Sequence, residues 1–326
     1  MYRPRRFGMA DTLTHGAREW RKWLFALLPL VALVEVIAQW VIQARVPSDD
    51  HWRAAASFIR SQRREGDLVT SAPLWTDPIA RMFFADMIPL RDAARPDATR
   101  YRRALVATIR GGENPDLRGW REASSRSFGP VTVRVMENPS PATVRYDLIE
   151  HARPGDAEVF RVRGDQRDPC VFRAGFPVVG GGLGQGALAG PERFQCPGDG
   201  WNYVGATVIE DMQHRGRLCL WSHPVQGGVM VTRWPRATVG ERFHGHHGIA
   251  YEAERGDDFG HHGGPVELRV LIDDREVGRD THRDEDGWRG FEFDTRAFAG
   301  GTHAVTVEVR AEDAGMRHYC FEGDLR

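Results

Sequence analysis

Apolar positions follow three different patterns along the chain. Residues 23–43 form a nearly unbroken apolar run, and about twenty helical residues suffice to cross the hydrocarbon core of a bilayer. Residues 48–153 mix helical spacing with strand spacing, which predicts a small α/β domain. In residues 157–326 short alternating runs recur between Gly, Pro, Asp and His turns, which predicts an antiparallel β-sandwich. The pattern therefore predicts a basic tail at 1–22, a single N-terminal transmembrane helix, an α/β domain and a sandwich.

Individual elements can be placed within these stretches. The α/β domain is expected to contain helices and strands, the helices at 51–64 and 76–87 and the strands at 66–72, 102–111 and 130–137. The sandwich strands are expected at 157–162, 202–210, 216–223, 228–234, 249–255, 266–273, 288–295, 303–311 and 317–325. The runs 288–295 and 303–311 alternate strictly, as in a sheet with one face in the core and the other in water.

The charges beside the apolar run predict its orientation. Six basic residues precede it, and the twenty residues after it contain three. Because basic residues are retained on the cytoplasmic side, we expect a protein of a bacterial inner membrane with a cytoplasmic N-terminus and the bulk of the chain in the periplasm. A cleaved signal peptide is the alternative. The cleavage site would be Ile42-Gln43-Ala44, which is a poor match because only Ala44 of the two key positions is small, and this favours a retained signal anchor.

One carboxylate interrupts the apolar run. Glu35 is costly to place in hydrocarbon, and Gln39 lies one helical turn further along the same face. The two side chains form a polar stripe suited to contact with a helix of another integral membrane protein. The alternative is that Glu35 lies close enough to the outer surface to reach water.

The four cysteines support an oxidising compartment. All four lie on the side expected to be exported, and their even number suits two disulfides. Three pairings are open on the sequence. We favour Cys170–Cys196, which would close a Gly-rich loop, and Cys219–Cys320, which would join an inner strand to the last one.

The charge balance excludes one broad class of partner. The 326 residues include 45 Asp and Glu against 44 Lys and Arg, a net charge of −1. Nucleic-acid binding needs a basic surface, and the arginines here are scattered, so we expect none. No strand leads into a glycine-rich phosphate loop, and neither a GxSxG nor an HExxH motif occurs, so no motif marks an enzyme.

Histidines are concentrated in one segment of the second half. In an extended segment His244 and His246 point the same way, giving two imidazoles that can share a transition metal such as Zn²⁺ or Cu²⁺. His262, Asp257 or Asp258 would supply a third ligand across the following turn. The alternative is a hydrated loop whose imidazoles bind no ion.

One resemblance concerns the region that follows the apolar run. The sequence DDHWRAAASFIRSQRREGDLVTSAPLWTDPIARMFF resembles the exported segment after the membrane spans of polyprenol-phosphate-dependent glycosyltransferases of the mannosyltransferase kind. Those enzymes have many spans, whereas one is predicted here. The resemblance extends from the span through residue 109 and carries no catalytic motif, so it implies ancestry or a glycosylation neighbourhood rather than activity.

A second resemblance concerns the C-terminal half. The runs DGWRGFEFDTRAFAGGTHAVTVEVRA and RHYCFEGDL are similar to the closing strands of galactose-binding-like jelly rolls, the fold of many carbohydrate-binding modules. The resemblance implies a jelly-roll sandwich, sugar binding by loop aromatics and a structural Ca²⁺. Glu322 and Asp324 lie in the last strand, where such families place an acidic Ca²⁺ ligand.

Aromatic side chains of the sandwich are the candidates for sugar binding, since the apolar face of a sugar stacks on an indole or phenol ring. Six large rings come from this half: Trp201, Tyr203, Trp221, Trp234, Tyr251 and Trp288. The candidate site residues are Trp221, Trp234, Tyr251 and Trp288, with His223, Arg233 and Asp286 as partners for sugar hydroxyls. Most large rings of a sandwich lie in its core, so we expect one or two to be exposed.

These observations favour a non-enzymatic, membrane-anchored protein whose sandwich binds a glycan or glycoconjugate of the cell envelope. An accessory subunit of a larger membrane complex, recruited through its transmembrane helix and exported domains, is the alternative of a different class. A metal-dependent hydrolase that uses the His cluster is a third.

Overall fold

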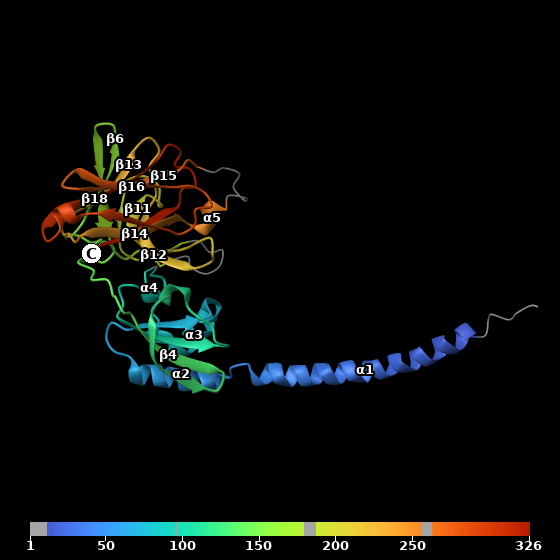
Figure 1. Cartoon of the computed structure of the whole chain (residues 1–326). Helices are drawn as coiled ribbons and strands as arrows, with labels where there is room; N and C mark the ends of the chain where they lie inside the picture. The colour runs from blue at the N-terminus through green and yellow to red at the C-terminus, as the bar shows by residue number, and fades with distance from the viewer. Residues whose placement is uncertain (1–11, 96, 179–186, 256–262) are drawn as a thin grey trace, which may run out of the picture.

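A long helix projects away from the rest of the protein (Figure 1). The computed structural model describes residues 12–95, 97–178, 187–255 and 263–326. Helix α1 (Thr12–Ala44) has 33 residues, and its side chains from Leu27 to Ile42 are exposed. It is long and apolar enough to cross a membrane, criteria that an N-terminal signal sequence also meets. By length and composition, α1 therefore meets the criteria of a membrane anchor and equally those of a signal sequence.

A small α/β region follows α1. Its helices are α2 (Asp49–Gln62), η1 (Leu74–Thr76), α3 (Asp77–Phe84), η2 (Ala85–Met87), α4 (Leu90–Ala93) and η3 (Pro115–Leu117). Its strands are β1 (Leu68–Ala72), β2 (Arg103–Ile109), β3 (Arg121–Phe128) and β4 (Val131–Glu137). They form a sheet in the order β1-β2-β4-β3, in which β1 and β2 are parallel and the other pairs antiparallel. Trp52 and Ile59 of α2 pack with Phe84 and Leu105 in one buried cluster.

Two antiparallel sheets form the rest of the chain. The first contains β17 (Arg289–Asp294), β14 (Arg242–Ile249), β19 (Tyr319–Leu325), β12 (Gly216–Ser222), β11 (Tyr203–Glu210), β10 (Arg193–Gln195) and β8 (Val171–Arg173) in that order, with β5 (Tyr146–Asp147) beside β19 and β9 (Leu188–Ala189) beside β11. The second contains β16 (Arg275–His282), β15 (Val266–Ile272), β18 (Thr302–Ala311), β13 (Val229–Thr238), β6 (Glu158–Arg163) and β7 (Gln166–Pro169). The short helices are α5 (Tyr251–Glu254) and η4 (Arg296–Phe298).

The two sheets share one core, which makes this part a β-sandwich. Leu220 and Phe243 of the first sheet pack with Met230, Trp234 and Val307 of the second. The expected fold class is confirmed: an N-terminal apolar helix, a small α/β region and an antiparallel sandwich.

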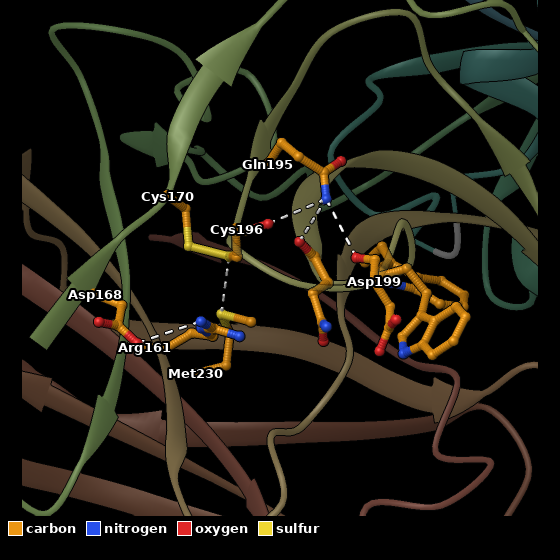
Figure 2. The surroundings of a disulfide bond; sticks show 10 residues. Arg161, Asp168, Cys170, Gln195, Cys196, Asp199 and Met230 are labelled. Atoms are coloured by element: carbon orange, nitrogen blue, oxygen red, sulfur yellow. Dashed lines mark hydrogen bonds and ion pairs between the residues drawn. A yellow bond between two sulfur atoms is a disulfide. The ribbon is translucent and has the colours of Figure 1, made fainter. Parts of the chain in front are cut away.

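Both expected disulfides form. Cys170 and Cys196 join the neighbouring strands β8 and β10, and Cys219 and Cys320 join β12 to β19. Figure 2 shows the first disulfide, where the Cys196 sulfur lies 3.9 Å from the sulfur of Met230. Nearby, Gln195 donates from its amide to the carbonyl of Asn202 at 3.0 Å. The hydrogen bond from Gln195 to Asn202 closes the turn between β10 and β11.

The structure differs from the sequence-based elements in several places. The segment expected as a strand at 249–255 contains the last residue of β14 and then the helix α5. The strands that were not expected are β3, β5, β7, β8, β9, β10, β14 and β16. Every residue of β3 except Phe128 is exposed, and β3 and β16 are edge strands, so neither needs the alternating apolar residues that reveal a strand. In β14, Gly and His replace the usual aliphatic residues.

Candidate functional site between the α/β region and the sandwich

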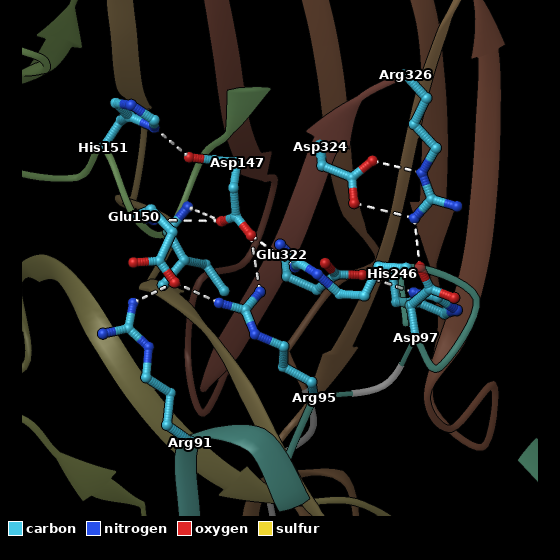
Figure 3. Close-up of polar contacts among 12 residues, drawn as sticks. Arg91, Arg95, Asp97, Asp147, Glu150, His151, His246, Glu322, Asp324 and Arg326 are labelled. Carbon is cyan, nitrogen blue, oxygen red and sulfur yellow. Dashed lines mark hydrogen bonds and ion pairs between the residues drawn. The ribbon is translucent and has the colours of Figure 1, made fainter. Parts of the chain in front are cut away.

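Buried ion pairs join the α/β region to the sandwich. The segment after α4 lies against the sandwich, where the amide of Leu218 donates to the carbonyl of Ala94 at 2.8 Å. Figure 3 shows Arg91 paired with Glu150, which follows β5, and Arg95 paired with Asp147, which is the last residue of β5. Because β5 is paired with β19, these contacts attach the α/β region to the centre of the first sheet.

A cleft of about 780 Å³ lies beside this junction. One wall comes from β1, η1 and α3, the floor from residues 90–95 and 97–101, and the other wall from the β11–β12 turn. In Figure 1 the junction lies around α4, between the two parts of the molecule. Sites for small ligands have volumes of about 300–1,000 Å³ and often lie between domains. The cleft therefore has the size and position of a ligand site.

The cleft wall begins where the two parallel strands end. Trp75 and Asp77 follow the carboxyl end of β1, and Asn114 and Asp116 follow that of β2. Asn114 donates from its amide to Thr70 Oγ1 at 3.2 Å, which joins the two groups. The carboxyl ends of parallel strands are the usual ligand edge of an open α/β sheet, because the connecting loops gather there.

An exposed indole and several charges line the cleft. Trp75 is 59% exposed, an unusual position for a large aromatic ring. Asp77 pairs with Arg81 at 2.6 Å on the same wall. Asp116 pairs with Arg215, which comes from the opposite wall. The cleft thus combines a flat apolar surface with carboxylate acceptors and guanidinium donors.

Burial and charge act together on the groups beside the cleft. Burial raises the pKa of Tyr101, and the nearby Asp92 carboxylate raises it further. For Asp97, burial alone would raise the pKa, but the charge of Arg326 and hydrogen bonds from Thr99 outweigh it and lower the pKa. Tyr101 is therefore a neutral phenol and Asp97 an anion at neutral pH.

The structure gathers four of the five expected metal ligands. His244 and His246 of β14 lie opposite Asp324 and Glu322 of β19 in the strand register. His246 Nδ1 lies 2.6 Å from Oε1 of Glu322, and the two imidazole centres are 5.1 Å apart. Burial raises the pKa of Glu322, although the hydrogen bond with His246 opposes the shift. The fifth expected ligand, His262, lies outside the described residues.

Asp97 of the α/β region also reaches this cluster. Arg326 forms ion pairs with Asp324 and with Asp97, as Figure 3 shows, and donates to Thr99 Oγ1 at 3.0 Å. Asp97, His244 and Asp324 form a second group whose ligand atoms lie within 4.8 Å of one another. Since Asp97 also lines the cleft, the cluster and the cleft adjoin.

The seven residues expected to bind sugar are distributed over both sheets, α5 and connecting segments instead of gathering at one surface. Trp234 is fully buried in the sandwich core, and Trp221 is buried against Tyr203, with ring centres 5.6 Å apart. His223 is buried, and its Nδ1 lies 2.7 Å from the carbonyl of Pro224. A ring enclosed by protein has no face on which a sugar can stack, which removes Trp221 and Trp234 as platforms.

The remaining four of these residues are half-buried. Tyr251 contacts His214 of the cleft, with ring centres 4.5 Å apart. Trp288 stacks on His246, at 6.3 Å between centres. Asp286 accepts from the amide of Arg283 at 2.8 Å, and Arg233 lies on β13 in the second sheet. Of the seven, Tyr251 therefore lies beside the cleft and Trp288 beside the histidine cluster.

The polar stripe of α1 has the geometry expected from the sequence. Glu35 and Gln39 are both exposed and line one shallow groove on the helix, together with Ala32, Val36 and Ile42. They face the same side because residues four apart share a helical face. A contact with a neighbouring helix stays a prediction.

Comparisons with known proteins give weak likenesses. No family model and no curated protein matches the chain, so the resemblance to glycosyltransferases gains no support. Among solved structures, the CBM51-2 and INT domains of Clostridium perfringens ZmpB match with a TM-score of 0.27 and 11% identity, over 37% of this chain and 26% of that one. The CBM51 of C. perfringens GH95, solved with methyl-galactose, has the same score and identity, over 37% of this chain and 80% of that one.

An adhesin domain gives a similar result. The K1 cleaved adhesin domain of Lys-gingipain from Porphyromonas gingivalis W83 matches with a TM-score of 0.25 and 10% identity, over 55% of this chain and 95% of that one. The chain spans about a quarter of the length of the ZmpB structure. At such scores the likenesses carry no argument about ligand or activity.

Proposed function

We propose that this chain is a non-enzymatic protein of the bacterial cell envelope that binds a glycan or glycoconjugate in the cleft between its α/β region and its sandwich. In this proposal residues 1–22 are cytoplasmic, residues 23–43 span the inner membrane, and domains at 48–153 and 157–326 lie in the periplasm. Helix α1 supports the anchor by its length and its exposed apolar side chains.

The exposed Trp75 in the cleft carries this proposal. An indole offers a flat apolar face to the C–H face of a sugar ring, while charged neighbours bind the hydroxyls. Asp77 and Arg81 lie on the same wall as Trp75, and Arg215 lies on the opposite wall. Leu74 and Leu90 add apolar lining, which suits a glycoconjugate with an apolar portion.

The test measures glycan binding by the full chain in detergent. Purified envelope polysaccharides of the producing bacterium, and their oligosaccharide fragments, are titrated calorimetrically into the wild type and two variants. The Trp75→Ala variant should lose at least about tenfold in affinity, since one well-placed aromatic contact contributes about 1.5 kcal/mol. The control is Trp201→Ala, because Trp201 is also exposed, at 51%, but does not line the cleft. Equal affinities of the two variants, or no binding by the wild type, would contradict the proposal.

A second function is favoured by an exposed apolar stripe that shares Trp75 with the cleft. Trp75, Ile79 and Met82 are exposed at spacings of four and three residues on η1 and α3, and Met82 is 77% exposed. An apolar stripe of this kind is typical of a surface that contacts another protein. Together with Glu35 and Gln39, it supports an accessory subunit of a larger membrane complex as the alternative.

A further inference from the structure

Two adjacent strands place four metal-binding side chains on one face of the first sheet. In the antiparallel register of β14 and β19, His244 lies opposite Asp324 and His246 lies opposite Glu322. Side chains at every second position share a face, so all four point to the side away from Phe243 and Phe321. The ligand atoms of His244, His246 and Glu322 lie within 4.8 Å of one another.

One unsatisfied polar atom and one deeply buried carboxylate mark this cluster. His244 Nδ1 is buried and has no hydrogen-bond partner among the described residues, although a buried polar atom usually has one. Glu322 is 5% exposed, and a carboxylate at that depth needs a cation or several donors. Its Oε1 accepts from His246 at 2.6 Å. A cation held between the two imidazoles and this carboxylate would satisfy all three groups.

The surrounding charges also favour a divalent cation. Glu322, Asp324 and Asp97 bring three carboxylates into the cluster, and Arg326 brings one guanidinium. When the four groups are ionised, negative charge exceeds positive charge by two. Arg326 neutralises the Asp324–Asp97 side, where it binds both carboxylates, and leaves Glu322 facing the histidines.

The donor set distinguishes between metals. Ca²⁺ takes oxygen ligands almost exclusively, whereas imidazole nitrogen suits Zn²⁺ and its neighbours in the transition series. Ligand atoms on a tetrahedral ion lie about 3.4 Å apart, because each metal bond is about 2.1 Å long. Small side-chain rotations bring three atoms that lie within 4.8 Å to that spacing. We propose that His244, His246 and Glu322 bind one divalent transition metal ion of the Zn²⁺ type.

Neighbouring residues hold the proposed ligands in place. Trp288 stacks on His246 with the rings 9° from parallel, and a β-carbon at Gly290 would lie 3.2 Å from the imidazole. A β-carbon at Gly245, between the two histidines, would lie 2.3 Å from the carbonyl of Glu322. The two glycines therefore allow β14 to bring both imidazoles against β19.

The test measures metal uptake by the full chain, prepared in detergent without a histidine tag. After chelator treatment, the protein is titrated with ZnCl₂ and, separately, with CaCl₂ by calorimetry, and zinc is counted by elemental analysis after dialysis. We expect one Zn²⁺ per chain and no competition by Ca²⁺. All four cysteines are in disulfides, so no thiol competes for the metal.

Matched variants locate the bound ion. His244→Gln and Glu322→Gln should each weaken zinc binding at least tenfold, and Asp324→Asn should weaken it by about 10–100-fold as an outer partner. The control is His303→Gln, because His303 also pairs with a carboxylate, Asp273, at 2.6 Å but lies in the other sheet. It should bind zinc as the wild type does.

Two results would overturn the proposal. One is a folded wild type, shown by its circular dichroism spectrum, that retains no zinc. The other is an equal loss of zinc in His303→Gln and Glu322→Gln. If a ligand variant fails to fold, the zinc-dependent rise in the unfolding temperature of the wild type, absent with CaCl₂, remains the deciding measurement. Glycan binding is measured separately, so failure there is distinguishable from failure here.

Discussion

The guanidinium of Arg95 lies 2.7 Å from a carboxylate oxygen of Asp147, across the junction of the α/β region and the sandwich. Each side chain is 7% exposed, and Arg100 donates to the same oxygen at 2.7 Å. Burial alone would raise the pKa of Asp147, but the two arginines outweigh it and lower the pKa. Asp147 is therefore an anion at neutral pH that holds two arginines from the other part of the protein.

Replacing Asp147 by Asn should destabilise the junction. The substitution leaves Arg95 with the half-exposed Glu150 as its remaining counter-charge, so the cost should lie below the about 3–5 kcal/mol of a buried charge that loses its only partner. Because the folded pKa lies below the unfolded value of about 3.9, the pair stabilises the wild type above pH 4, and this contribution is lost as the pH falls further. Thermal unfolding of the full chain in detergent at pH 7 and pH 3.5 measures both effects.

The control for this prediction is Asp294→Asn. Asp294 pairs with Arg296 at the surface, where both side chains are largely exposed, so its loss should leave the unfolding temperature unchanged at pH 7. An unfolding temperature of Asp147→Asn equal to that of this control would show that the buried pair does not stabilise the junction.

His223 should make the sandwich sensitive to mild acid. Burial lowers its pKa to about 4, whereas an unfolded histidine titrates near 6.5. The unfolded chain therefore takes up a proton first as the pH falls, which favours unfolding. Between pH 7 and pH 4.5 the wild type should lose about 2.5 kcal/mol through this group. His223→Gln should lose correspondingly less.

Denaturant unfolding at the two pH values tests this. His303→Gln is the comparison, because it removes an imidazole far from the contact of His223 with Trp221 and His318. If the wild type and His223→Gln lost the same stability on acidification, the assignment to His223 would be wrong.

The polar stripe of α1, formed by Glu35 and Gln39, should be required for binding to a partner protein in the membrane. If the chain is a subunit of a larger complex, its partner should co-purify with it from native membranes at fixed stoichiometry in mild detergent. Glu35→Leu should abolish that association, because it removes the carboxyl group available to a neighbouring helix. Val34→Leu is the control, since Val34 is exposed on α1 outside the groove of Glu35 and Gln39. Mass spectrometry of the purified material that found no partner in the wild type would exclude the subunit function.

The outline of the fold could be predicted from the sequence because it depends on local patterns. The apolar run became α1, and the alternating runs 303–311 and 317–325 became β18 and β19. Three disulfide pairings were open on the sequence, and the favoured one is the one that forms. By contrast, β3 has no apolar alternation, since it is an exposed edge strand, and β14 replaces aliphatic residues with His and Gly.

The metal cluster was partly predictable and the cleft was not. The equal orientation of His244 and His246 follows from the alternation of a strand, and their meeting with Glu322 required only that β14 and β19 be neighbours. The sugar-binding residues were expected on sandwich aromatics, yet Trp234 lies in the core, because two sheets bury their large rings between them. Trp75 follows the strand predicted at 66–72. Its position after the carboxyl end of that strand was the only feature of the sequence that marked it as a candidate ligand-binding residue.

The sequence by itself determined the apolar helix, the change from α/β to all-β structure, and the side chains that share a face of β14, because each depends on residues a few positions apart. Only the tertiary structure decided which surfaces meet. Arg95 and Asp147 are 52 residues apart, and Asp116 and Arg215 are 99 apart. The periodicity of a sequence predicts whether a side chain is buried but not which residues cover it. The cleft at Trp75 and the contact of Asp97 with the histidine cluster therefore exist only where the α/β region packs against the sandwich.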